Sequence, residues 1–157
     1  MLKIHLRKAH VLIVAILAGA GTVARSVAAD APCGQYSIWS DGTVHDNYTE
    51  LVWQRSLAQN GMTWNDAMSF CGSAGQGTLP GCGWRLPSVN ELQTIVDDST
   101  SNPAIDSATF PNTGSGPYWT SSLDGPGQAW TVAFFYGELQ PVATSGAVAV
   151  RCVRSAQ

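Results

Sequence analysis

Short segments rich in aromatic and β-branched residues predict strands at the start of the folded part of the chain. Segments 36–40 and 43–46 have this composition, and they flank Asp41-Gly42, a dipeptide typical of tight hairpin turns. Segment 50–54 predicts a third short strand. The folded part is therefore expected to begin with a hairpin and one further strand.

After Asn60-Gly61 the apolar residues change to a helical spacing. Thr63 is a suitable N-cap, and Asp66 places an acidic side chain in the first turn. Four residues then follow at i, i+3, i+4 and i+7, the spacing of one helix face: Trp64, Ala67, Met68 and Cys71. This face predicts that Cys71 points into the core. Residues 72–83 are rich in Gly and Ser and predict a loop, which contains Cys82.

A second helix and several later strands complete the pattern. Ser88 and Glu91 form a capping box, and an apolar face runs on to about residues 97–98: Val89, Leu92, Ile95 and Val96. Residues 99–117 predict a long irregular connection. Strand-like segments follow at 118–121, 129–136, 138–142 and 147–154, with Gly137 suited to a tight turn. This order predicts an α+β domain, mainly antiparallel sheet with two helices and long loops.

The first 29 residues are predicted to be a signal peptide rather than part of the fold. A basic start precedes an apolar run over residues 11–24, and Val27-Ala28-Ala29 offers small residues for cleavage. The run is too short to span a bilayer comfortably, so no stable membrane insertion is expected after cleavage. A single domain, residues 30–157, then remains, secreted or periplasmic.

Removal of the signal peptide changes the charge of the chain. Four arginines stand against eleven acidic residues in 30–157, a formal net charge of −7, and no lysine is left. Binding to nucleic acid or another polyanion requires clustered basic residues, so neither is an expected partner. The four cysteines of an exported chain predict two disulfides, and their spacing does not fit a zinc site.

Eight segments, in order along residues 35–154, resemble the Lcl C-terminal domain of bacterial collagen-like adhesins. Two of the most specific are Trp84-Arg85-Leu86-Pro87 and Tyr118-Trp119-Thr120-Ser121-Ser122. The full set is 42–46, 51–54, 63–71, 83–92, 102–106, 110–113, 118–122 and 150–154. The resemblance implies a C-type-lectin-like fold in which both chain ends meet in one sheet beside two helices.

The resemblance also implies a disulfide pattern and bears on metal binding. A bond between the first helix and the final strand corresponds to Cys71–Cys152, which leaves Cys33–Cys82 as the second. Sugar-binding C-type lectins hold calcium through Glu-Pro-Asn or Gln-Pro-Asp and Trp-Asn-Asp motifs, and none of these occurs between Tyr118 and Trp130. Residues 120–128, where such a loop would lie, contain one acid, so no metal is expected there. Three loop acids are an alternative metal site, although solvation is the favoured interpretation: Asp97, Asp98 and Asp106.

Aromatic and polar residues near that short loop are the candidate ligand site. They are Trp119, Asp124, Gln128, Trp130, Tyr136 and Glu138. Aromatic rings pack against the apolar face of a sugar, and carboxylates accept hydrogen bonds from its hydroxyls. The favoured alternative is that both tryptophans belong to the core, because aromatic residues in strands are mostly buried.

Candidate catalytic residues are few. Arg85 could hold a ligand carboxylate, but a partner within the protein is favoured. His45 lies beside Asp46 without a nucleophile motif. The related formylglycine-generating enzymes use a cysteine pair near the C-terminus, whereas Cys152 has no second cysteine nearby.

The sequence therefore predicts a non-catalytic recognition module without a cofactor. Its expected partner is a glycan or a cell-surface protein. A structural envelope protein is the second hypothesis and an enzyme the third.

Overall fold

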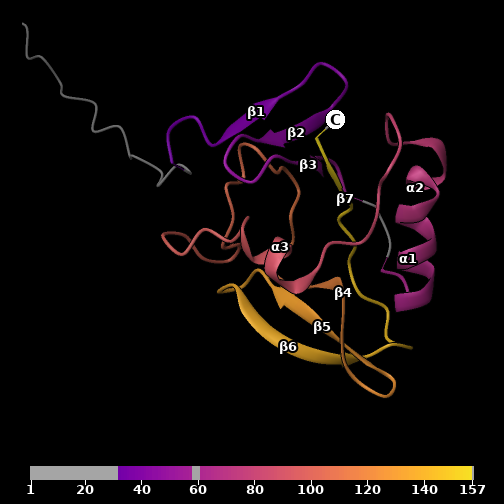
Figure 1. Cartoon of the computed structure of the whole chain (residues 1–157). Helices are drawn as coiled ribbons and strands as arrows, with labels where there is room; N and C mark the ends of the chain where they lie inside the picture. Colours follow the sequence, from indigo (N-terminus) through magenta and orange to yellow (C-terminus); the bar gives the residue numbers. More distant parts are fainter. Residues whose placement is uncertain (1–31, 58–60, 157) are drawn as a thin grey trace, which may run out of the picture.

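The computed structural model describes residues 32–57 and 61–156. The predicted signal peptide lies outside the described residues, and its cleavage remains a prediction. Within the described part the chain is a mixed α+β domain built from two antiparallel sheets and three helices, as predicted for the fold class (Figure 1). None of the described helices has the length and apolar character that crossing a bilayer requires.

The first sheet joins the two ends of the described chain. Its strand order is β1 (Tyr36–Ile38), β2 (Thr43–Asp46), β3 (Leu51–Gln54) and β7 (Val153–Ser155), with all neighbours antiparallel. The predicted hairpin is confirmed. Gly42 has φ +80°, a conformation that glycine adopts without strain in this tight turn.

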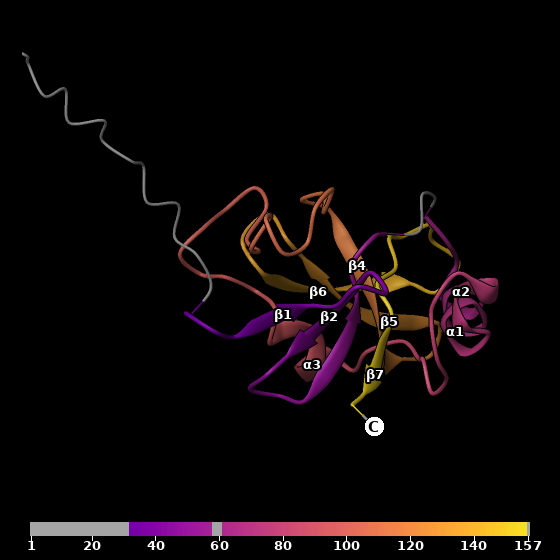
Figure 2. The ribbon, with the colours of Figure 1, turned by 90° about the horizontal axis from the view of Figure 1, so that it is seen from above.

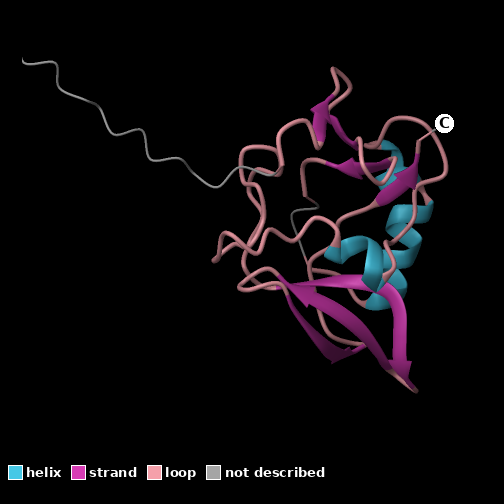
Figure 3. Ribbon diagram, turned by 60° about the vertical axis from the view of Figure 1, so that its left-hand side comes forward, coloured by secondary structure: helices cyan, strands magenta, loops and turns pink. Residues whose placement is uncertain are grey.

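The second sheet is a three-stranded meander. It consists of β4 (Pro117–Gly125), β5 (Gln128–Ala133) and β6 (Glu138–Ala143), in that order. Tyr118 and Val132 lie opposite each other and join Leu92 in one buried cluster, whereas Trp119 and Ala129 belong to another. Both faces of this sheet therefore carry core. Helix α3 (Val89–Gln93) lies between the two sheets, whereas α1 (Trp64–Gly72) and α2 (Ala74–Gly77) lie along one side of the domain (Figure 1; Figure 3).

Helix α1 (Trp64–Gly72) begins as predicted, because the Thr63 side chain accepts a hydrogen bond from the Asp66 amide. Ala67 and Cys71 are buried, but Met68 is 38% exposed, so its assignment to the inner face is wrong. Phe70, on the other flank, packs against the core instead. The predicted loop after α1 also contains a short helix, α2 (Ala74–Gly77).

Helix α3 (Val89–Gln93) has the predicted capping box but is shorter than predicted. The amide and hydroxyl of Thr94 both donate to the Glu91 carbonyl, and the Val96 amide donates to that of Gln93. These i→i+3 bonds tighten the last turn and end the helix. Ile95 is nevertheless buried in the core, as the apolar spacing predicted.

The C-terminal segment is not the single strand that was predicted over 147–154. Val148 pairs with Met62, and Ala149 bridges to Tyr118 of the second sheet. Only Val153–Ser155 runs as a strand, in the first sheet. Residues 147–154 are mostly apolar because this segment passes through the core from the second sheet to the first.

The Cys71–Cys152 disulfide is confirmed, with the two Cα atoms 5.4 Å apart. The predicted Cys33–Cys82 bond is wrong: the structure does not join these two exposed cysteines. Cys33 precedes β1, and Cys82 lies in the loop whose Gly81 approaches Arg154 of β7. Strands β1 and β7 form opposite edges of the four-stranded sheet, about 14 Å apart at about 4.8 Å per spacing.

The two cysteines therefore border strands at opposite edges of the first sheet, whereas a disulfide requires Cα atoms about 4.4–6.8 Å apart. Figure 2 shows the start of β1 and the loop after α2 on opposite sides of the molecule.

Candidate functional site

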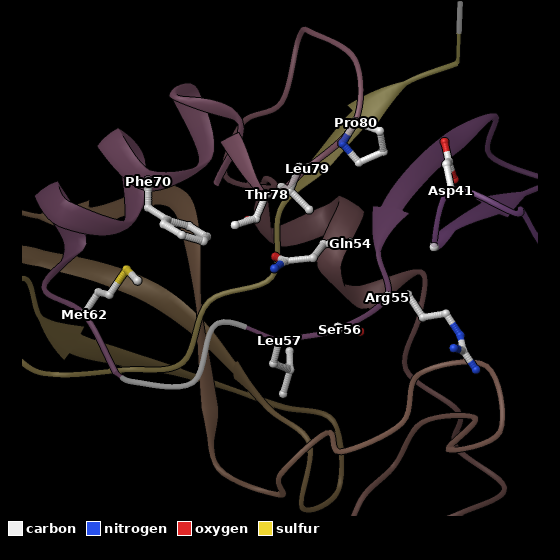
Figure 4. A pocket seen from close by; sticks show the side chains of 11 residues that line it. Asp41, Gln54, Arg55, Ser56, Leu57, Met62, Phe70, Thr78, Leu79 and Pro80 are labelled. Carbon is white, nitrogen blue, oxygen red and sulfur yellow. The ribbon is translucent and has the colours of Figure 1, made fainter. Parts of the chain in front are cut away.

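An open cleft of about 470 Å³ lies between the first sheet and the helical side of the domain (Figure 4). The turn between β1 and β2, the segment after β3, helix α1 and the loop after α2 form its walls. The lining is Asp41, Gly42, Gln54, Arg55, Ser56, Leu57, Met62, Phe70, Thr78, Leu79 and Pro80. Its volume lies within the range of small-ligand pockets.

The interior of the cleft is mainly apolar. Phe70 projects from α1 toward Leu79, and Leu57 lies below them (Figure 4). The Gln54 side chain points into the same space, and its Oε1 accepts a hydrogen bond from the Cys152 amide at 3.0 Å. Since this bond fixes the amide, the cleft offers a preorganised polar group among apolar side chains.

Charged groups occupy one rim of the cleft, and both have internal partners. One Asp41 carboxylate oxygen accepts hydrogen bonds from the amide and the hydroxyl of Thr43. The Arg55 Nε donates to the Thr109 carbonyl at 3.1 Å, which directs the guanidinium away from the centre (Figure 4). The polar groups of the described lining are the Asp41 carboxylate, the Gln54 amide, the Arg55 guanidinium and the hydroxyls of Ser56 and Thr78.

Trp119, predicted as part of a ligand site, is a core residue. It is fully buried, and its indole Nε1 donates to the Met62 carbonyl at 2.7 Å. Its ring cannot contact a ligand at the surface, so this residue is removed from the candidate site. Trp130, in contrast, is only half-buried on β5.

The other predicted ligand residues do not converge on one point. Asp124 and Gln128 are exposed at the β4–β5 hairpin, whereas Tyr136 and Glu138 are exposed at the β5–β6 turn. These turns lie at opposite ends of β5, a strand of six residues whose first and last Cα atoms are about 17 Å apart, at about 3.3 Å per step (Figure 1). The residues therefore belong to two separate surfaces.

Arg85 has the internal partner that the sequence favoured. Its Nη1 and Nη2 donate to the two carboxylate oxygens of Glu91 at 2.8 and 2.7 Å. This bidentate bond lowers the pKa of Glu91 from its ordinary value of 4.5 to about 2, helped by bonds from Ser88. Arg85 thus fixes the start of α3 and is not available as a ligand group.

Glu91→Gln is expected to lower the free energy of unfolding by about 1–2 kcal/mol near neutral pH, because the charge-assisted bonds are lost at a partly exposed site. Since the pKa of Glu91 falls on folding, the wild-type advantage should be complete above pH 4.5 and disappear toward about pH 2. Urea unfolding of both proteins at a series of pH values measures this difference in stability. Glu138→Gln, at an exposed glutamate, is the matched control, and a difference independent of pH would contradict the role of the charge.

His45 is held in a surface stack rather than a catalytic pair. Its ring stacks on Trp39 with centroids 5.1 Å apart, and its Nδ1 lies 2.8 Å from Asn47 Oδ1. The neighbouring Asp46 is fully buried and accepts hydrogen bonds from the amides of Tyr48 and Thr49. The two side chains therefore do not form a histidine–carboxylate dyad.

Asp97, Asp98 and Asp106 line a second hollow of about 180 Å³ beside Tyr36. Burial, followed by the charges of Asp46 and nearby loop acids, raises the pKa of the Tyr36 hydroxyl. One oxygen of Asp97 accepts from the Ser99 amide, and Asp106 accepts from the Thr109 hydroxyl. Among the described residues no group of three such side chains has an arrangement that could hold a metal ion.

Each of the four arginines in the described chain is bonded within the domain. The contacts are Arg55 with the Thr109 carbonyl, Arg85 with Glu91, Arg151 with the Gln54 carbonyl, and Arg154 with the Ser155 carbonyl. The Arg85–Glu91 pair is the one salt bridge of the described residues. The remaining carboxylates therefore dominate the surface charge, and no cluster of basic side chains is available for a polyanion.

The cleft itself was missed at the sequence level. The sequence predicts only a strand at Gln54 and a loop at Leu79, and Phe70 lies outside the predicted helix face. The available signal was that Phe70 precedes Cys71, because the disulfide holds this part of α1 against the C-terminal segment.

Comparison with known proteins assigns a family. The family model of the Lcl C-terminal domain matches residues 42–154, which is most of the chain. No curated protein matches the chain.

Proposed function

Because the chain belongs to the Lcl C-terminal domain family, we propose that it is an exported, non-catalytic recognition module that binds a neutral cell-surface glycan without calcium. Export, to the periplasm or beyond the cell, is supported by the N-terminal apolar run and by the Cys71–Cys152 disulfide. The meeting of both chain ends in one sheet supports a C-type-lectin-like fold.

The observation that carries the proposal is the cleft of Figure 4. The Phe70 ring offers an apolar face to a sugar, while the Gln54 amide and the Asp41 carboxylate offer hydrogen bonds to hydroxyls. The internal bonding of the arginines supports a neutral ligand over a sulfated one. Nucleic acid is disfavoured for the same reason.

A partner protein is the second candidate. Five lining residues are apolar: Leu57, Met62, Phe70, Leu79 and Pro80. They would suit a hydrophobic side chain of a cell-surface protein. This alternative corresponds to the structural envelope protein.

Binding of the exported protein to a broad glycan array, with calcium and with chelator, tests the proposal. We expect a neutral-glycan signal that is insensitive to chelator. Phe70→Leu retains an apolar side chain and removes the ring, so it should weaken the signal about fivefold, the value of one aromatic contact. Met68→Leu, on the exposed flank of α1, is the matched control and should leave binding unchanged.

Two results would contradict the proposal. Silence of a folded protein across the array would favour the protein partner. Loss of binding in Trp130→Ala or Asp124→Asn, with retention in Phe70→Leu, would place the glycan at the β4–β5 hairpin instead.

A further inference from the structure

An exposed aromatic ridge lies at the turn between β5 and β6, away from the cleft. We define the ridge as Phe135, Tyr136 and Leu139, which are 43%, 60% and 42% exposed. The two rings pack edge to face with their centroids 4.6 Å apart. Large hydrophobic residues gathered at one exposed turn are typical of an interaction surface rather than of isolated surface residues.

The backbone of the ridge is fixed against the rest of the domain. Gly137 has φ +79°, and a Cβ at this position would clash with Val96 Cγ1. The Asn102 amide donates to the Phe135 carbonyl at 2.9 Å. The turn is therefore held between the end of the α3 segment and the loop that follows it (Figure 1). A ligand would meet rings that are already in place.

Carboxylates flank the ridge, and we define Asp98 and Glu138 as its acidic margin. Glu138 follows the Gly137 turn directly, and Asp98 lies two residues after Val96, against which a Cβ at position 137 would lie. Asp97 is not part of the margin, because one of its carboxylate oxygens is buried and the other accepts a hydrogen bond from the Ser99 amide. In the described part of the chain neither Asp98 nor Glu138 takes part in a salt bridge. The ring faces and the carboxylates together present negative potential to solvent.

We propose that the ridge and its acidic margin bind a basic, arginine- or lysine-rich segment of another protein. A guanidinium or ammonium group stacks on an exposed ring, and a neighbouring carboxylate accepts its hydrogen bonds. The charge complementarity selects this partner, because the surface combines apolar rings with acids and has no basic side chain of its own. This site is independent of the cleft and of its proposed glycan.

Titration of the exported, ¹⁵N-labelled protein with a blocked peptide of alternating arginine and glycine tests the proposal by NMR. We expect amide shifts to concentrate at residues 96–104 and 134–139, and binding to weaken as salt rises. Phe135→Ala combined with Tyr136→Ala should weaken binding about tenfold, the value of two exposed cation–π contacts. Asp98→Asn combined with Glu138→Gln should weaken it about threefold.

Matched controls separate this site from general attraction to an acidic protein. Tyr48→Ala removes an exposed ring elsewhere, and Asp124→Asn removes an exposed acid at the β4–β5 hairpin. Both should leave the affinity unchanged, and the corresponding glutamate–glycine peptide should not bind. Equal weakening in the controls, shifts that map to the cleft, or no binding at low salt would each overturn the proposal. Thermal unfolding confirms that every variant is folded.

Discussion

Replacement of both Cys71 and Cys152 by alanine is expected to lower the free energy of unfolding by about 4–5 kcal/mol. The bond joins residues 81 positions apart, and closing a loop of that length removes a large part of the conformational entropy of the unfolded chain. In a domain of this size the loss corresponds to a fall in Tm of about 10–20 °C. Denaturant unfolding of the oxidised wild type and the double variant measures the difference directly.

Cys33→Ser is the matched control for the disulfide prediction. Cys33 is exposed, so its substitution should change stability by less than about 0.5 kcal/mol. A reductant should destabilise the wild type and leave the double variant unaffected. A double variant as stable as the wild type would show that the unfolded chain is already restricted without the bond.

The elements that the sequence predicted well are those with local causes. The Asp41-Gly42 hairpin, the Thr63 cap and the Ser88 capping box each depend on residues within four positions of one another. Such bonds form in the same way whatever the rest of the fold does. The Cys71–Cys152 bond, in contrast, followed from the family resemblance.

The predictions that failed depend on contacts between distant segments. The apolar run over 147–154 satisfies the spacing of a strand, but it crosses between two sheets. The Cys33–Cys82 bond is not formed, and the two cysteines border strands at opposite edges of a sheet whose strand order is not readable from the sequence.

The candidate ligand site shows the same limit. Its residues are close in sequence, but β5 carries them to opposite ends of a sheet. Proximity along a strand is therefore a poor guide to a common site. The cleft, in turn, gathers residues from separate segments of the chain, and apart from the position of Phe70 beside Cys71 no local pattern marks it.

Arg151 is the other residue whose role only the structure reveals. The side chain is fully buried, and its guanidinium lies 4.8 Å from the centre of the Phe110 ring. Its Nη1 donates to the carbonyls of Gln54 and Arg55 at 2.5 and 3.1 Å, and its Nη2 donates to the Thr113 hydroxyl at 2.7 Å. Burial lowers the pKa of Arg151 to about 10. The guanidinium thus connects the end of β3 to the loop before β4 without a carboxylate partner.

Arg151→Met is expected to lower the free energy of unfolding by about 3–4 kcal/mol, because it retains most of the volume but leaves buried carbonyls unpaired. Arg154→Met is the matched control in the same segment; it removes one bond to a carbonyl and a stack on Trp84, and should cost about 1 kcal/mol. Denaturant unfolding of both variants gives the comparison. A stable Arg151→Met variant would mean that the desolvation of the buried cation outweighs its hydrogen bonds, and that the connection between β3 and the loop is maintained by apolar packing around Phe110.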